Sequence, residues 1–447
     1  MKEIPITLNK VSELKYVPQY HDVKTYANIF GGIFQWEADD WESTSLSWKK
    51  SCYIHAGISG VEVTLKGPDA QKLVSMSAIN NCYNWKVGFA KHLVMCDDNG
   101  LISSHALVNR TEADAFVMSA ANPWPWIKLL NTGKYNAQPF FRDIFVFQCA
   151  GPKSLTCIED LTQTDLHDMK CLEFRPVKIP GLDAKVEVER IGMSGTLSYE
   201  LRGAGEDGPA VYDAFYKLGK EKYDMKRLGW RTYFVNHTEG GYPQTSCSFS
   251  QACDYDPEFV SSGMNLLPPV YTGSYDPANY RARLRTPGEV GWMWMAKFDH
   301  EFVGRAAVEA EAKAPKRTIV TLEWNTDDVV NIYDSQFRDG EPYKYMEMPI
   351  APQQPAGGHA DRVLTVDGKE IGVSSSVVYS KYFHKTISQC TIDVDQADIG
   401  NEVIVEWGDF GGKIKKVRAT VARFPYLDLV RNEKYDMNTV PSGVIER

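Results

Sequence analysis

The sequence predicts an α+β fold that ends in a small β-barrel or sandwich. Val61, Val63 and Leu65 alternate with polar residues, as in a half-buried strand, and Gly67-Pro68 then leads into a helical pattern over 69–74. The same order of strand, Gly-Pro and helix returns over 144–158. Short alternating segments separated by turns follow residue 324, which is typical of a small all-β unit.

The other elements follow from the same periodicities. Residues 1–50 are polar and aromatic and predict irregular structure with a short helix. Strands are expected at 185–188 and 199–201, and Pro209 then opens a helix that reaches Leu218. Residues 255–290, rich in Pro, Gly, Ser and Tyr, predict a long loop or lid. We therefore expect two α+β lobes within residues 1–330 and a small β-barrel, with strands at 363–366, 403–407 and 417–421, within 331–447.

Composition excludes several classes of protein. The chain has 447 residues and a formal net charge of -9, which argues against a general nucleic-acid binder. Its nine cysteines are odd in number and form no C-x-x-C pair, so neither a disulfide framework nor a zinc knuckle is expected. The nine histidines show no close ligand spacing, and no metal site is predicted. Without an 18-residue apolar run or an apolar segment after Met1, we expect a cytoplasmic protein that does not enter membranes.

Two motifs favour structural interpretations. Residues 203–208 match G-x-G-x-x-G, but Glu206 and Asp207 would place negative charge beside a bound pyrophosphate. We interpret this segment as a turn into a helix and not as a dinucleotide site. His300 beside Asp299 suggests a catalytic pair, yet adjacent strand residues point to opposite faces, which favours a structural role.

Glu200 is the strongest candidate for a binding residue. It follows a turn that contains Gly195 and stands between the apolar Tyr199 and Leu201. An isolated Glu is usually a solvated surface group, but a partly buried carboxylate needs hydrogen-bond donors. The edge of a pterin offers two parallel N–H donors that one carboxylate can accept together. Tyr233, close in sequence to Arg231 and His237, is a weaker candidate because a lone Tyr is mostly a packing residue.

Several segments together resemble a known superfamily. They are residues 194–201, 297–305, Trp48-x-x-Ser51-Cys52, Ile79-Asn80 with Trp85, Arg231-x-Tyr233 with Glu239, and Trp324-Asn325-x-Asp327-Asp328. In this order they are similar to the folate-dependent aminomethyltransferase superfamily of the glycine-cleavage T-protein. Within it, the likeness is greatest to the tetrahydrofolate-dependent aromatic O-demethylases of the vanillate and 3-O-methylgallate type.

The resemblance implies a three-lobed fold with a central folate channel, followed by the C-terminal β-barrel. It implies tetrahydrofolate as cofactor and the transfer of a methyl group from an aromatic methyl ether to N5, which gives 5-methyltetrahydrofolate and a phenol. The implied catalytic residues are Tyr233, placed beside the ether oxygen, and His105. The implied cofactor-binding residues are Glu200, Asn80, Arg231, Tyr199 and Trp324.

The chain departs from the family pattern at three places. His105 stands where the T-protein has an aspartate, residues 119–122 lack the basic residue of the vanillate-type enzymes, and Ser59 replaces a histidine. The donor therefore either lacks a carboxylate or binds it through another group, such as Arg281, Arg283 or Arg285. Alternative functions are demethylation of a sulfonium or methylamine donor, aminomethyl transfer, and non-catalytic folate binding.

Overall fold

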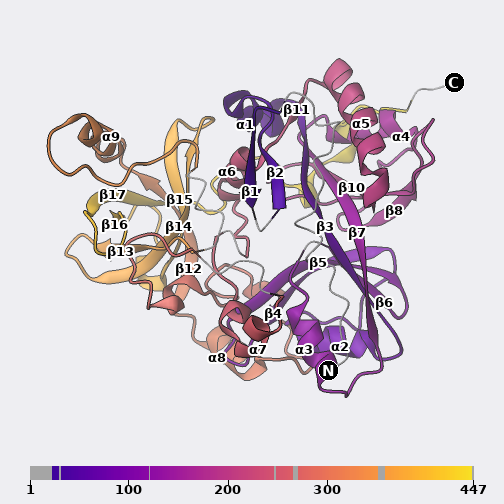
Figure 1. Cartoon of the computed structure of the whole chain (residues 1–447), viewed down its shortest axis with the longest axis horizontal. Coiled ribbons are helices and arrows are strands. Elements are labelled where there is room, and N and C mark those ends of the chain that lie inside the picture. Colours follow the sequence, from indigo (N-terminus) through magenta and orange to yellow (C-terminus); the bar gives the residue numbers. More distant parts are fainter. Residues whose placement is uncertain are drawn as a thin grey trace.

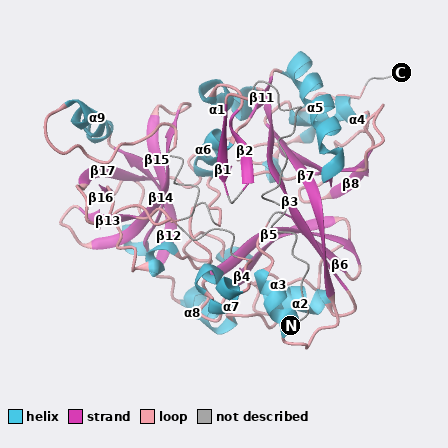
Figure 2. Ribbon diagram, in the orientation of Figure 1, coloured by secondary structure: helices cyan, strands magenta, loops and turns pink. Residues whose placement is uncertain are grey.

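A computed structural model describes residues 23–29, 32–119, 121–245, 248–264, 270–350 and 358–444. Residues 1–50 were expected to be irregular with a short helix, and residues 1–22 of them lie outside these ranges. The helix is confirmed at Trp41–Lys50, but Thr25–Ile29 and Gly32–Glu37 are paired strands and not irregular structure. Figure 1 shows a large curled sheet with helices on its outside and a separate small barrel beside it. The same view coloured by secondary structure shows that helices and strands are mixed in the first part, whereas strands dominate the barrel (Figure 2).

The large sheet is the body that carries the functional site. Its strand order is β4-β5-β6-β3-β7-β10-β9-β8, and β11 pairs with β3. A bridge between Phe89 and Glu173 connects the two ends of this order, so the sheet curls far enough to enclose an inner face. The strands are β3 (Cys52–Lys66), β4 (Phe89–Cys96), β5 (Ile102–Glu112), β6 (Ala115–Ser119), β7 (Gln138–Ala150), β8 (Phe174–Val177), β9 (Val186–Glu189), β10 (Ser198–Ala204) and β11 (Met225–Arg227).

Helices cover the apolar outer face of this sheet. They are α2 (Ala70–Ser77), α3 (Trp124–Asn131), α4 (Ser154–Thr162) and α5 (Gly208–Tyr223). Both predicted units of strand, Gly-Pro and helix are confirmed. At the second turn Gly151 has φ +127°, and a Cβ there would lie 2.4 Å from the backbone oxygen of Ser51. Only glycine fits such a close approach, so the turn fixes how α4 packs on the sheet.

Helix α6 (Trp230–Gly240) lies at the centre of the molecule. It packs against α1 (Trp41–Lys50), the strand β2 (Gly32–Glu37) of the β1 (Thr25–Ile29) hairpin, and β14 of the barrel. Every residue of α6 except Arg231 is buried. The helix therefore presents side chains to the large sheet and to the barrel at once.

The C-terminal part is a closed six-stranded barrel, as the sequence predicts. Its order is β12 (Arg317–Trp324), β15 (Lys385–Asp393), β14 (Glu370–Ser380), β13 (Asp361–Thr365), β16 (Glu402–Trp407) and β17 (Lys415–Ala422). The helix α9 (Thr326–Asp334) follows β12. Since β12 precedes residue 331, the barrel takes one strand from the part predicted as 1–330, and the division into domains stays a prediction.

The loop predicted over 255–290 contains the short helix α7 (Pro257–Ser261) and a 3-10 turn over Tyr280–Arg283 among its described residues. Helix α8 (Arg305–Lys313) follows and closes the connection to the barrel. In the described part of the chain, none of the helices combines the length and the hydrophobicity needed to cross a membrane. Whether residues 255–290 close over a ligand stays a prediction.

Candidate functional site

A row of buried polar side chains crosses the inner face of the sheet. His55 of β3 pairs with Gln148 of β7, Gln148 with Glu200 of β10, and Glu200 with Glu189 of β9. Residues opposite each other on neighbouring strands project from the same face. All four side chains are buried. We call these four residues the polar row.

Other residues of the protein satisfy only part of the hydrogen-bonding groups of the polar row. Gln148 Nε2 donates to Glu200 Oε1 at 2.8 Å, and Asn109 Nδ2 of β5 donates to Glu189 Oε2 at 2.9 Å. His55 Nδ1 lies 2.7 Å from the Leu228 carbonyl oxygen, so it carries the proton and Nε2 presents a lone pair.

Three buried acceptors of the row, namely Gln148 Oε1, Glu189 Oε1 and His55 Nε2, have no hydrogen-bond partner among the residues that the structure describes. Such acceptors are costly to bury without a donor. The row therefore suits a flat ligand that carries several N–H groups.

Burial also changes the acidity of the two carboxyl groups. It raises the pKa of Glu200 to about 7, although the hydrogen bond from Gln148 and the positive charge of Arg202 both lower this pKa. It raises the pKa of Glu189 to about 8, again against the charge of Arg202. A ligand that donates hydrogen bonds to these groups favours their ionised form.

Tyr233, predicted to be catalytic, reaches the same face from α6. Its ring stacks on His55 with centroids 4.3 Å apart, and the ring of His237 lies 4.1 Å away. The Tyr233 hydroxyl donates to Met193 Sδ at 3.7 Å. His237 Nδ1 lies 2.7 Å from Asn236 Oδ1. The spacing of 233 and 237 is one helical turn, which brings both rings to the sheet.

His105, the second predicted catalytic residue, lies in a neighbouring cluster. The Tyr242 hydroxyl is 3.3 Å from His105 Nδ1 and 3.5 Å from His92 Nδ1. The His105 ring lies 4.4 Å from the ring of Trp292. Burial lowers the pKa of His92 to about 4 and that of His105 well below its ordinary value, so both imidazoles are neutral near pH 7.

Tyr242 connects the two predicted catalytic residues. Its ring lies 5.5 Å from that of His237, which in turn contacts Tyr233. Burial raises the pKa of Tyr242, and the charge of Glu200 raises it further. Tyr233, His105 and Glu200 thus meet in one interior region.

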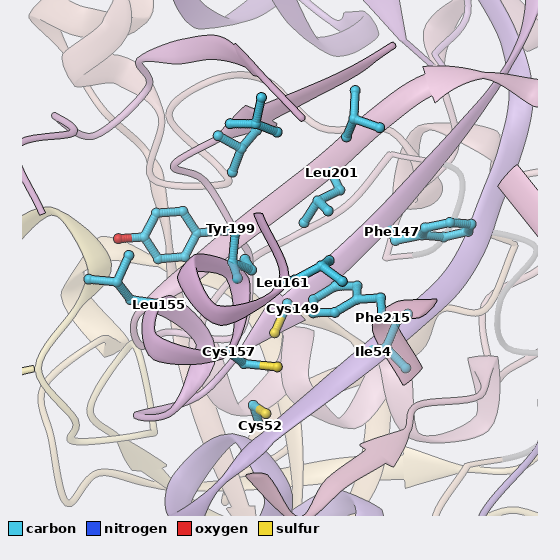
Figure 3. Packing of buried hydrophobic residues seen from close by; sticks show 14 of the residues in the cluster. Cys52, Ile54, Phe147, Cys149, Leu155, Cys157, Leu161, Tyr199, Leu201 and Phe215 are labelled. Atoms are coloured by element: carbon cyan, nitrogen blue, oxygen red, sulfur yellow. The ribbon is translucent and has the colours of Figure 1, made fainter. Parts of the chain in front are cut away.

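Two of the predicted cofactor ligands lie in hydrophobic cores. Tyr199 projects from the opposite face of β10 to Glu200 and packs with Leu155 and Leu201, as Figure 3 shows. Trp324 belongs to the core of the barrel and donates to Ser388 Oγ at 2.9 Å. Strand alternation explains the first placement, because neighbouring residues face opposite sides. We therefore exclude both from the site.

Asn80 and Arg231 are used by the protein framework. Asn80 Nδ2 donates to the His92 carbonyl at 2.9 Å, and its Oδ1 accepts from Val94 N at 3.1 Å, so it braces β4. Arg231 binds Glu37 Oε2 and the Met348 carbonyl, both at 2.6 Å. Neither contacts the polar row, and a role in folate binding stays a prediction for both.

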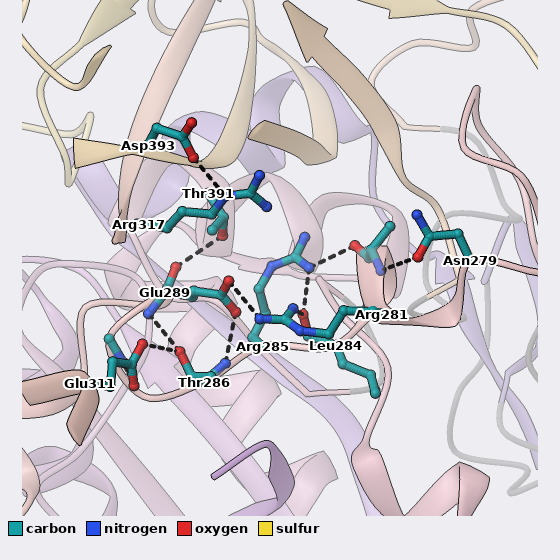
Figure 4. Close-up of polar contacts among 12 residues, drawn as sticks. Asn279, Arg281, Leu284, Arg285, Thr286, Glu289, Glu311, Arg317, Thr391 and Asp393 are labelled. Carbon is teal, nitrogen blue, oxygen red and sulfur yellow. Dashed lines mark hydrogen bonds and ion pairs between the residues drawn. The ribbon is translucent and has the colours of Figure 1, made fainter. Parts of the chain in front are cut away.

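The three arginines considered for a donor carboxylate are also engaged, and Figure 4 shows the contacts of Arg281 and Arg285. Arg281 binds Glu289 Oε1 at 2.9 Å. Arg283 donates to several backbone carbonyls, including that of Gly358 at 2.9 Å. Arg285 donates to the carbonyls of Ala282 and Leu284, both at 2.8 Å. The N–H groups of these three guanidiniums therefore hold the segment of residues 276–289 in place.

His300, given a structural role from the sequence, is buried with Nε2 3.1 Å from the Ala78 carbonyl oxygen. The expected strand is wrong, because residues 298–300 form a turn, and His300 Nδ1 lies 3.4 Å from Asp299 Oδ1.

One group of possible metal ligands lies away from the polar row, on the other side of the sheet. Glu159 of α4, Asp165 and His167 bring one ligand atom each within 4.8 Å of one another. The Glu159 carboxylate already accepts from Leu166 N at 2.7 Å and Gly443 N at 2.9 Å. These contacts anchor the C-terminal segment and account for the group without an ion.

Sequence reasoning missed Gln148, His55, Glu189 and Tyr242. Gln148 offered a signal, because it is a polar residue within the apolar run Phe145-Val146-Phe147 before Cys149. A polar side chain that interrupts a buried strand usually has a partner. The others stand in ordinary sequence and depend on the strand register.

Comparisons with known proteins identify the family of this chain. The model of the GCVT N-terminal domain matches residues 45–256. Sesamin methylene transferase of Sinomonas sp. (strain No.22) is 32% identical over 437 residues, which cover 93% of this chain and 95% of that protein. Syringate O-demethylase of Sphingobium sp. (strain NBRC 103272 / SYK-6) is 27% identical over 435 residues, which cover 91% of this chain and 93% of that protein.

A solved structure supports the fold alone. Aminomethyltransferase T of the glycine cleavage system from Bartonella henselae superimposes with a TM-score of 0.67 at 14% identity, covering 92% of this chain and 95% of that one. The fold and the superfamily expected from the sequence are confirmed. This chain is an enzyme of the folate-dependent aminomethyltransferase family of the glycine-cleavage T-protein, whose members transfer one-carbon groups with tetrahydrofolate.

Proposed function

We propose that the protein transfers a methyl group from an aromatic methyl ether to N5 of tetrahydrofolate, giving 5-methyltetrahydrofolate and a phenol. The observation that carries this proposal is the polar row, with Glu200 held by Gln148 at 2.8 Å inside the curled sheet. The similarity to a sesamin methylene transferase and a syringate O-demethylase supports an aromatic ether as the donor.

The residues of the row fit a reduced pterin. A pterin presents N–H groups at several edges, and the row presents the oxygens of Glu200, Gln148 and Glu189 together with the lone pair of His55. Glu200 would accept two parallel hydrogen bonds, and Gln148 would hold that carboxylate in place. Bound tetrahydrofolate supplies the nucleophilic nitrogen.

The reaction balances without a further reagent. The bond between the ether oxygen and the methyl carbon breaks, a bond from that carbon to N5 forms, and one proton passes from N5 to the oxygen. The Tyr233 hydroxyl would donate to the departing oxygen as negative charge develops there, an effect of about a hundredfold or more. His55 stacks on Tyr233 and fixes its ring.

A neutral imidazole lies in the same interior region and offers a lone pair as a hydrogen-bond acceptor. His105 is buried and uncharged near pH 7, and Tyr242 links it to His237 beside Tyr233. The buried rings also exclude water, which strengthens each hydrogen bond in the site.

Methylene transfer is a second candidate. The sesamin enzyme is the more similar of the two aromatic-compound relatives, and its name describes transfer of a methylene group. The same residues would then act on a carbon that is held by two aromatic oxygens. The products would be a catechol and a methylene-tetrahydrofolate.

One assay separates the candidates. The purified protein is incubated with tetrahydrofolate and either methoxyphenols or methylenedioxybenzenes, and the folate product is identified by mass. Methyltetrahydrofolate from a methoxyphenol supports the proposal, and methylene-tetrahydrofolate from a methylenedioxybenzene supports the second candidate. Loss of folate binding without loss of folding in Glu200→Ala, but not in Glu159→Gln, would tie the activity to the polar row.

A further inference from the structure

Among the described residues around Arg202, carboxylates outnumber cations. Arg202 of β10 donates to Glu62 and, at 2.7 Å, to Ser119 Oγ. It also lies 3.7 Å from Glu189 and 3.9 Å from Glu187. The buried guanidinium of Arg202 therefore lies near three carboxylates, of which Glu62 also accepts from the more exposed Arg142 at 2.5 Å. Glu200 precedes Arg202 by two residues and lies on the same face of β10.

The histidines of this interior do not supply positive charge. Burial lowers the pKa of His55 to about 4, of His92 to about 4 and of His237 to about 3, and that of His105 falls well below its ordinary value. Near pH 7 these four side chains are neutral, so they offer lone pairs and ring surfaces to a ligand.

Other buried cations are bound elsewhere in the fold. Lys49 forms an ion pair with Glu239 at 2.5 Å, where both side chains are almost completely buried. Arg283 donates to the Gly358 carbonyl, and Arg285 donates to that of Leu284, as Figure 4 shows for the second contact. Arg190 donates to the carbonyl oxygens of Met169 and Asn432. Moving any of them to a new anion would leave these partners unsatisfied.

We infer that the methyl donor is an uncharged aromatic ether and lacks the carboxylate that a benzoate-type donor carries. The inference rests on the proposed function, since it concerns the second substrate of that site. A donor carboxylate brought into this interior would lose its hydration and would find the buried guanidinium of Arg202 already engaged by Glu62, Glu187 and Glu189. A neutral ring meets none of these penalties and can pack against Tyr233, Tyr242 and Trp292.

A matched set of three donors tests this inference. They are 2-methoxyphenol, vanillate, which adds a carboxylate to it, and the methyl ester of vanillate, which is neutral but larger than the acid. The value of kcat/KM is measured for each with tetrahydrofolate, and direct binding of each donor is measured by calorimetry without tetrahydrofolate. We expect the two neutral donors to exceed vanillate by at least about tenfold in both measurements.

The outcomes are distinct. If the ester is used and vanillate is not, the discrimination is due to charge and not to size. A kcat/KM for vanillate equal to or above that of its ester would overturn the inference while leaving methyl transfer in place. Failure of all three donors to methylate tetrahydrofolate would remove the proposed function and this inference with it.

Discussion

Replacing Glu200 with glutamine should stabilise the folate-free protein while weakening folate binding. Burial raises the pKa of Glu200 from its ordinary value of 4.5 to about 7. The folded protein therefore holds this proton more tightly than the unfolded chain, and stability falls as pH rises from 4.5 through 7. Each pH unit is worth about 1.4 kcal/mol, so ionised Glu200 costs about 3 kcal/mol above pH 7.

Glutamine keeps the shape of the side chain and removes this cost. We expect Glu200→Gln to exceed the wild type in free energy of unfolding by less than about 1 kcal/mol at pH 5 and by about 3 kcal/mol at pH 8. Two charge-assisted hydrogen bonds to the pterin would be lost, which weakens tetrahydrofolate binding by about 3 kcal/mol, or about a hundredfold in Kd.

The measurements are urea unfolding at both pH values without folate, and calorimetric titration with tetrahydrofolate. Glu159→Gln is the matched control, because that buried carboxylate accepts from Leu166 N and Gly443 N. It should destabilise the protein at both pH values and leave folate affinity unchanged. A Glu200→Gln protein no more stable than the wild type at pH 8, or with unchanged folate affinity, would refute the reasoning.

Three further substitutions, together with Tyr199→Phe as a control, test the site and the packing around it. Tyr233→Phe should lower the single-turnover rate by about a hundredfold with unchanged folate affinity, whereas Tyr199→Phe should preserve both; equal rates in the two variants would remove the role of Tyr233. His105→Phe should slow turnover without weakening folate retention, and a wild-type rate would exclude it from the reaction. Lys49→Met leaves buried Glu239 without its cation and should lower the free energy of unfolding by about 3–5 kcal/mol in denaturant titration; a change below about 1 kcal/mol would contradict the buried ion pair.

Local sequence was enough to predict the framework of the fold. Short-range sterics decide where a strand runs and where a helix starts. The alternation over 61–65 and the apolar run over 144–147 therefore predict strands, and the Gly-Pro turns predict helix starts. The apolar neighbours of Glu200 suggested a partly buried carboxylate, and the structure confirms its burial. Its role in folate binding came from the resemblance and stays a prediction. Tyr199 was placed beside it in the sequence, but a strand sends the two side chains to opposite faces.

The rest of the candidate site depended on contacts between distant segments. Glu200 meets Gln148 and Glu189 only because β10 pairs with β7 and β9 in one particular register. A shift by one residue would turn every one of these side chains to the outer face. His55 and Tyr233 stack only because α6 is held against β3 by the surrounding elements, which the sequence periodicity does not report.

The sequence by itself determined the α+β class and the C-terminal barrel, because these depend on local periodicity. It also determined the superfamily and pointed to Glu200 of β10, because the motifs that carry the resemblance stand together in the chain. Only the tertiary structure decided which polar groups share the inner face and which arginines are already bound. The physical reason is that a side chain's partner, burial and acidity are set by whatever the fold packs against it, and those neighbours come from strands and helices far away in sequence.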